Sequence, residues 1–299
     1  MLVRISVAAV VFLSMIASAF SQDGARAHHL IPENTNIISL STTFVHTELD
    51  AGVFDVGVVT PSYRRSIDVM GQAGWILIGM PIGSMSASLD TPIGVIDLEN
   101  DPAQGDLFVG AALGLVGSPS LSPAEFAQHK PGFRASIAGR VYLPTGDYDA
   151  GRILNLGGNR WSLQASLPIS YALGDSMIDP DLTTFEIVPV VQIFGDNNDP
   201  FGPAEVVSQD MLFGLEGHIT RNFGRNVWAS LDAAYEFGGE TRVDGVAMGD
   251  AVQAASVGAT LGLTLNSSLS LRFSYNEVVY SNEPNFVGRE FRAVSAFRF

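Results

Sequence analysis

Apolar and polar residues alternate in runs of about 10–15 positions along most of this chain. Successive side chains of a β-strand point to opposite faces, so a period of two marks a strand with one apolar and one polar face. In the last run, Phe291, Phe297 and Phe299 share one face, and Glu290 and Arg292 share the other. Strands of soluble proteins usually have about five or six residues, whereas a tilted membrane strand needs about 9–11. The length of the runs therefore favours a lipid-facing apolar surface around a polar interior.

The alternating runs predict an all-β fold, a closed antiparallel up-and-down transmembrane β-barrel of about 12 strands. An even number of strands returns both ends of the barrel to the periplasm, with short turns there and longer outer loops. A large soluble β-sandwich or barrel with one buried face is the alternative. The expected strands are 36–46, 53–65, 72–86, 105–117, 132–144, 160–174, 183–195, 210–223, 226–238, 251–266, 268–281 and 287–299.

One link on the periplasmic side is long, between residues 118 and 131. It contains Ser122, Pro123 and Glu125, which are a capping serine, a proline at the first helical position and a glutamate at the third. This spacing is typical of a helix start. We therefore predict a short periplasmic helix near 122–129.

The N-terminus has the features of a secretory signal peptide. Arg4 precedes an apolar run from Ile5 to Ile16, and Ala17-Ser18-Ala19 fits the small-x-small cleavage pattern. We expect residues 1–19 to be the signal peptide, with cleavage after Ala27 as the alternative and 28–299 as the single barrel domain. An uncleaved anchor is less favoured, because a spanning helix needs about 18–20 apolar residues. An exported protein without a later spanning helix is either soluble outside the inner membrane or a β-barrel. Together with the alternating runs, this predicts the outer membrane of a Gram-negative cell.

Composition excludes several classes of function. The chain has no cysteine, so disulfides, thiolate nucleophiles and cysteine zinc sites are ruled out. With 16 Lys+Arg against 31 Asp+Glu, the net charge of −15 argues against nucleic acid as a partner. His28-His29 alone is a weak metal signal, so we predict no metal and no cofactor.

Three kinds of partner are expected instead. A barrel contacts membrane lipid and lipopolysaccharide, and its lumen admits a small-molecule solute. The terminal Phe299, with apolar residues at alternate positions before it, resembles the C-terminal strand signal that the barrel-assembly machinery reads. The acidic outer loops could also attract divalent cations that bridge to lipopolysaccharide, although solvated loops are the favoured interpretation.

Charged and polar residues on the inward faces are the candidate pore lining. Rings of charge in a lumen set ion or solute preference, but opposed charges can also fill a narrow barrel as a paired polar core. The aromatic and apolar residues Trp75, Leu77, Phe108 and Phe194 interrupt this set and would favour hydrophobic solutes. The pore-lining candidates are Arg134, Arg140, Tyr142, Glu216, His218, Asp232, Glu236, Arg272, Glu277 and Arg292.

The expected outer loop at 144–161 is rich in glycine, charge and amide side chains. Its glycines permit tight turns, and its charges could pair with one another. The loop is predicted either to constrict or gate the lumen, or to plug the barrel mouth as a structural element. The candidate residues are Asp147, Asp149, Arg152, Asn155, Asn159 and Arg160.

No catalytic residues are predicted. His218 has Ser208, Ser230 and Asp232 as sequence neighbours, but a hydrolase needs a serine, a histidine and an acid in contact. A lumen histidine paired with a carboxylate is the simpler interpretation. We expect the protein not to be an enzyme, and a lipid-modifying barrel enzyme stays as the second alternative.

The stretch LPTGDYDAGRILNLGGNRW, from Leu143 to Trp161, resembles a motif of the transporter-like outer-membrane family named MetA-pathway of phenol degradation. Similar pieces occur in the same order around it, and the resemblance runs from about His28 to Phe299. They include PSYRR at 61–65, SPAEF at 122–126, FGDN at 194–197 and WASLD at 228–232. The resemblance implies an outer-membrane barrel associated in name with aromatic catabolism.

These observations favour an outer-membrane channel or transporter-like barrel that passes small solutes, hydrophobic or aromatic ones among them. A non-transporting structural or partner-binding barrel is the alternative.

Overall fold

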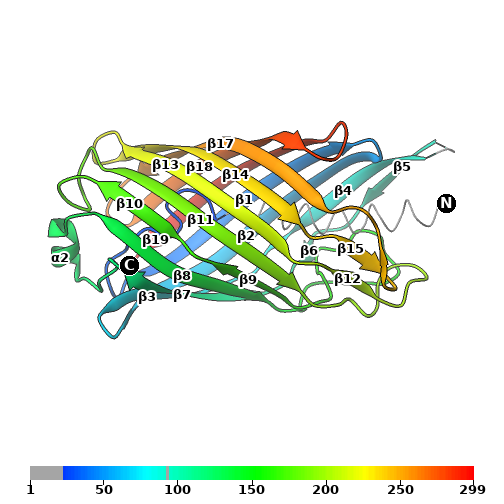
Figure 1. The fold of residues 1–299 in the computed structure, drawn as a ribbon, viewed down its shortest axis with the longest axis horizontal. Helices are drawn as coiled ribbons and strands as arrows, with labels where there is room; N and C mark the ends of the chain where they lie inside the picture. The colour runs from blue at the N-terminus through cyan, green and yellow to red at the C-terminus, as the bar shows by residue number, and fades with distance from the viewer. Residues whose placement is uncertain (1–22, 92–93) are drawn as a thin grey trace.

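The computed structural model describes residues 23–91 and 94–299. Its long antiparallel strands wrap into a cylinder and are tilted relative to the cylinder axis (Figure 1). The strands are β1 (Asn36–Leu49), β2 (Gly52–Val69), β3 (Gln72–Gly79), β4 (Ile82–Thr91), β5 (Gly94–Glu99), β6 (Ala103–Gln104), β7 (Phe108–Val116), β8 (Phe133–Tyr142), β9 (Ser162–Ser166), β10 (Ile169–Leu173), β11 (Thr183–Phe194), β12 (Val207–Gln209), β13 (Leu212–Asn222), β14 (Val227–Gly238), β15 (Thr241–Val243), β16 (Val246–Ala247), β17 (Val252–Thr264), β18 (Leu269–Ser281) and β19 (Val287–Arg298).

The barrel closes because β1 pairs with β2 on one edge and with β19 on the other. It has 12 staves, since β3 with β4, β9 with β10, and β5 to β7 each contribute to one stave. Two of these breaks lie at Pro81 and Pro168, and proline has no N–H for a strand ladder. The predicted closed antiparallel barrel of 12 strands is therefore confirmed.

The main departure from expectation lies between residues 87 and 104. The sequence predicted an outer loop there, whereas β4 continues to Thr91 and pairs with β5 and β6. This hairpin projects past the rim in Figure 1. The polar and charged residues of the stretch suggested a loop. In the structure, five of the six residues of β5 are exposed, whereas Ala87 and Leu89 of β4 are buried on the inward face.

The end that carries both barrel termini is the periplasmic end. The Asn36 N–H donates to the Phe299 carbonyl at 3.0 Å, and the helix α2 (Pro123–Gln128) lies at the same end (Figure 1). Ser122 and Glu125 form the reciprocal capping box of this helix. The predicted short helix is thus confirmed. Among the described residues, no helix is long and apolar enough to cross a membrane.

Apolar side chains cover the outside of the barrel, and polar ones are buried inside. Leu231 is 69% exposed and Ile187 is 53% exposed, whereas Thr220 and Glu216 of the inward face are 2% and 5% exposed. Contact between apolar side chains and water is unfavourable, so an exterior covered by such side chains requires lipid acyl chains around it. The barrel is accordingly an outer-membrane protein.

Neighbouring cross-strand rows mark the outer edge of this apolar belt. Phe44, Phe291 and Tyr275 share one row on the exterior. The next row toward the outer rim brings Arg289 within 3.3 Å of Glu277, an ion pair suited to the headgroup region. The hydrocarbon boundary on this side therefore falls between the two rows.

A charge on the apolar belt should destabilise the barrel. We expect Ile187→Arg to lower the free energy of unfolding in lipid by about 2–4 kcal/mol, because the guanidinium would lie near mid-bilayer. The measurement is equilibrium unfolding in urea with the protein in liposomes. The control is Val246→Arg, at a site that is 64% exposed in the outer sheet, the separate three-stranded sheet of β12, β15 and β16, and it should change stability little. Equal effects of both variants would contradict the lipid-facing assignment.

Candidate functional site in the barrel lumen

Residues 23–35, called the N-terminal segment, precede β1 and lie inside the barrel. Ala25 is 0% exposed and Leu30 is 4% exposed, although neither belongs to a strand. The segment is fixed at the periplasmic end, where the Ser66 hydroxyl donates to the Pro32 carbonyl at 2.6 Å. From there it extends into the lumen and occupies its periplasmic half.

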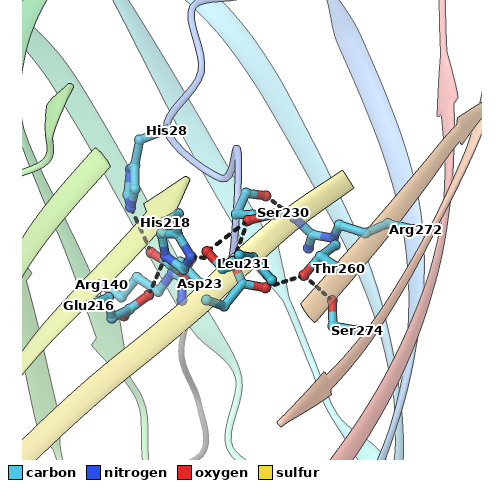
Figure 2. A network of polar contacts seen from close by, with 12 residues as sticks. Asp23, His28, Arg140, Glu216, His218, Ser230, Leu231, Thr260, Arg272 and Ser274 are labelled. Atoms are coloured by element: carbon cyan, nitrogen blue, oxygen red, sulfur yellow. Dashed lines mark hydrogen bonds and ion pairs between the residues drawn. The ribbon is translucent and has the colours of Figure 1, made fainter. Parts of the chain in front are cut away.

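Arg140 of β8 forms an ion pair with the Asp23 carboxylate. The other carboxylate oxygen lies 3.0 Å from His28 Nε2, so the acid and the imidazole are held side by side (Figure 2). Both side chains of the ion pair are largely buried, with 15% and 12% of the side chain exposed. Pairing with Arg140 compensates the desolvation of Asp23.

Three further guanidinium groups donate to backbone carbonyl oxygens of the segment. The donors and acceptors are Arg64 Nη1 to Ala27 at 3.0 Å, Arg272 Nη1 to Ala25 at 3.0 Å and Arg134 Nη2 to His28 at 3.1 Å. We call these three residues and Arg140 the arginine wall; they come from β2, β8 and β18. The wall therefore holds the segment through main-chain atoms as well as through Asp23.

Aromatic rings flank the arginine wall. The His28 ring stacks on Trp75 with 6.4 Å between centroids, and the Arg64 guanidinium lies 4.7 Å from the Trp75 ring centre. Arg140 lies 5.8 Å from the Phe108 ring. Cations over aromatic faces are attracted by the ring quadrupole. This side of the lumen thus combines positive charge with flat apolar surfaces.

Acidic side chains line the lumen on β13 and β14. The His218 ring lies between two carboxylates, with Nδ1 2.8 Å from Asp232 and Nε2 3.4 Å from Glu216. Asp232 also accepts hydrogen bonds from the hydroxyls of Ser230 and Thr260, the latter at 2.6 Å (Figure 2). A buried carboxylate that accepts this many hydrogen bonds holds the surrounding side chains in place.

Removing the Asp232 carboxylate should be costly. We expect Asp232→Ala to destabilise the barrel by about 3–5 kcal/mol, because it leaves His218 and two hydroxyl groups without their shared acceptor. Chemical unfolding of the reconstituted protein measures the change. Asp210→Ala is the control, since Asp210 pairs with Arg242 on the exposed outer sheet and should cost little.

Arg26 links the segment to this acidic side. Its Nη2 donates to Asn222 Oδ1 at 2.6 Å, and its guanidinium lies 4.4 Å from the Trp228 ring. The segment therefore presents a carboxylate toward the arginine wall and a guanidinium toward β13 and β14. These contacts on two sides hold the segment in one orientation in the lumen.

Nine of the ten predicted pore-lining residues point into the lumen, in keeping with the alternation of their strands. Arg292 pairs there with Glu290 at 3.0 Å. Glu277 is the exception and the prediction of an inward side chain was wrong. It shares the face of Tyr275 and pairs with Arg289 outside the barrel, as the parity of β18 requires.

The outer half of the lumen is occupied by the mouth loop, residues 143–161. Leu154, 5% exposed, packs on an apolar patch of inward-facing residues near the outer ends of their strands. The members of this patch are Val45, Phe54, Val56, Met85, Ala87 and Leu89. The loop therefore folds into the barrel and covers its mouth.

Asp106 anchors the mouth loop. Its carboxylate accepts hydrogen bonds from the N–H groups of Thr145, Gly146 and Gly158 at 3.1, 2.9 and 2.9 Å. A Cβ on Gly146 would lie 2.7 Å from the Cα of Gly157, so two parts of the loop backbone are in contact there. The glycines of this motif are needed for that close approach.

The six candidate residues of the mouth loop do not form one cluster. Asp149 pairs with Arg152 at 3.3 Å on the exposed surface, and Asn155 Nδ2 donates to the carbonyls of both. The others bind partners outside the loop: Asp147 accepts from the Gln104 N–H at 2.7 Å, Asn159 donates to Asn197 at 2.8 Å, and Arg160 donates to Gln209 at 2.5 Å.

The cluster around His218 has the wrong connectivity for a hydrolase. A catalytic serine must donate to the histidine that activates it, whereas Ser230 donates to Asp232. His218 meets carboxylates through both ring nitrogens. Among the described residues, no group of three or more potential ligands is placed to hold a metal ion.

The sequence matches the family described as MetA-pathway of phenol degradation over residues 34–294. The chain belongs to this family. An outer membrane channel from Pseudomonas putida F1 has the same fold at a TM-score of 0.72 and 18% identity, covering 90% of this chain and 97% of that one. The beta domain of the Bordetella autotransporter Brka matches at a TM-score of 0.54 and 12% identity, covering 89% of this chain and 100% of that one. No curated protein matches the sequence.

The N-terminal segment and its contacts were missed by the sequence argument. The segment carries no alternation, and Asp23 and Arg26 resemble ordinary residues of a linker after a cleavage site. Arg64 and Glu186, which is 5% exposed, lie on inward faces and could have been found by the parity rule that identified Arg140. Leu154 gave no signal, because a single leucine in a glycine-rich loop has no period.

Proposed function

We propose that this protein is an outer-membrane channel for small solutes, with a lumen narrowed from both ends. The observation that carries the proposal is how the lumen is filled. Two segments that are not staves, the N-terminal segment and the mouth loop, enter it from opposite ends. Barrels filled permanently by their own strand side chains need no such inserts, whereas inserted segments narrow a passage. The P. putida channel of the same fold supports the proposal.

The solutes that suit this lumen are small and include hydrophobic or aromatic molecules. Beneath the mouth loop the wall is apolar, with Phe54 and Met85 at its centre. A solute that displaced Leu154 would meet that patch first. The polar half of the lumen follows, where Trp75 and Phe108 keep flat faces toward the interior.

Planar-bilayer recording tests the proposal. Purified protein should give discrete conductance steps, and liposomes containing it should admit small aromatic solutes faster than empty liposomes. A Leu154→Asp variant should conduct more, because a charged side chain does not stay in the apolar patch. Bilayers that stay silent with folded protein, for both forms, would reject the channel.

The second candidate is a non-transporting barrel, favoured by the density of paired charges around His218 and Arg140. Silent bilayers would support it. The lipid-modifying enzyme is not supported by the His218 cluster. An assay of lipid hydrolysis that found activity sensitive to His218→Ala would restore it.

We infer two further properties in line with the sequence. The exterior pair Glu277–Arg289 suits contact with lipopolysaccharide headgroups, and β19 with the Phe299 that follows it suits the barrel-assembly machinery. The predicted signal peptide, residues 1–19, lies outside the described residues. Cleavage after Ala27 would remove Asp23 and Arg26, so the mass of the mature chain distinguishes the two cleavage sites.

A further inference from the structure

The N-terminal segment places two groups of a particular chemistry against the arginine wall. The Asp23 carboxylate binds Arg140. Its second oxygen lies 3.0 Å from Nε2 of His28, whose ring stacks on Trp75. A carboxylate beside a planar ring is the chemistry of a small aromatic acid. The wall is thus already filled by a molecule of that kind, supplied by the chain itself.

The arginine wall carries more positive charge than the segment neutralises. Of the four guanidinium groups, that of Arg140 forms an ion pair with the single carboxylate of Asp23, whereas the three others donate to uncharged carbonyl oxygens. A carboxylate carries the charge opposite to a guanidinium and can accept two parallel hydrogen bonds from it, whereas a carbonyl oxygen is uncharged and offers one acceptor atom. An anion that replaced a carbonyl here would therefore gain interaction energy.

The aromatic side chains select among anions. Trp75 offers one face to His28, and Arg64 and Arg140 lie over the Trp75 and Phe108 rings, so a flat ligand would be stacked while its carboxylate is bound. On the opposite strands, Asp232 accepts hydrogen bonds from His218 and two hydroxyl groups, which compensate part of its negative charge locally. A cationic or aliphatic solute would satisfy only part of this environment.

We propose that the arginine wall and Trp75 form a binding site for small aromatic carboxylates, and that Asp23 and His28 occupy this site as an internal competitor. The inference rests on the proposed channel function and names its solute class. Displacement of the segment by such a solute would clear the periplasmic half of the lumen while keeping the guanidinium groups paired.

Calorimetric titration of the purified barrel with benzoate tests the site. Benzoate should bind at least tenfold tighter than benzyl alcohol or benzylamine, and tighter than cyclohexanecarboxylate. Asp23→Asn should tighten benzoate binding several-fold, because it weakens the competitor. Equal binding of benzoate and benzyl alcohol, or benzoate binding unchanged or weakened by Asp23→Asn, would overturn the proposal.

Matched variants locate the site. Arg140→Gln should weaken benzoate binding at least tenfold, whereas Arg221→Gln, which alters an arginine paired with Asp181 at the periplasmic rim, should not. If Arg140→Gln fails to fold, Trp75→Leu is the second variant, with the exposed Trp161→Leu as its control. Equal losses in a variant and its control would overturn the site.

Bilayer recordings separate this proposal from the channel itself. Conductance without selective benzoate binding would leave the channel and remove the site. Selective binding sensitive to Arg140→Gln, in a barrel that never conducts, would keep the site and remove the channel.

Discussion

Deleting residues 20–31 from the mature chain should raise the single-channel conductance several-fold. The deletion removes Asp23, Arg26 and the buried residues that fill the periplasmic half of the lumen, but it leaves every stave intact. Water and counter-ions would then solvate the arginine wall, so the loss of the segment's hydrogen bonds costs little stability. The measurement is planar-bilayer recording at fixed salt, with β-content by circular dichroism as the check on folding.

Asp23→Asn is the graded comparison for the deletion. It keeps the segment but breaks its ion pair with Arg140, so we expect brief openings to the conductance of the deletion variant. Arg221→Gln should behave as the unaltered protein. Identical conductance in all four proteins would mean that the segment does not limit the passage.

Asp106→Ala should release the mouth loop, with the second largest effect. The substitution leaves the N–H groups of Thr145, Gly146 and Gly158 without their acceptor, at about 1–3 kcal/mol for each group that finds no water. A loop freed from this anchor withdraws Leu154 from the apolar patch. Trypsin should then cleave after Arg152 many times faster than in the unaltered protein.

The control for the mouth loop is Asp210→Ala. This substitution removes a carboxylate that accepts hydrogen bonds from Arg242 and leaves the loop anchor untouched. Bilayer recordings of Asp106→Ala should also show larger and noisier currents. A cleavage rate equal to that of the control would show that Asp106 does not hold the loop.

The barrel could be predicted from the sequence because lipid imposes a period of two over long strands. Phe297 and Leu231 must face acyl chains, so the neighbouring polar residues must face inward. Parity also predicts inward positions for Arg134 and Asp232, and it would have placed Glu277 correctly outside. The residues of the lumen wall could therefore be predicted from the alternation within each strand.

The contents of the lumen could not be predicted in this way. Asp23 and Leu154 reach the interior through contacts with residues a hundred or more positions away, with Arg140 in one case and with Val45 and Phe54 in the other. A segment without alternation of apolar and polar residues does not indicate from its sequence which residues it will pack against. Likewise, five of the six residues of β5 are exposed, and its mixed sequence resembles a loop.

The position of the N-terminal segment is the central claim, and a single cysteine tests it directly because the chain has none of its own. Ala25→Cys, at a site with 0% exposure, should react with a water-soluble maleimide far more slowly than Met70→Cys, at a site with 100% exposure. The measurement is the labelling rate of each purified variant in liposomes permeable to the reagent, and the two rates should become equal in urea. Equal rates in the folded protein would place the segment outside the barrel and contradict the account.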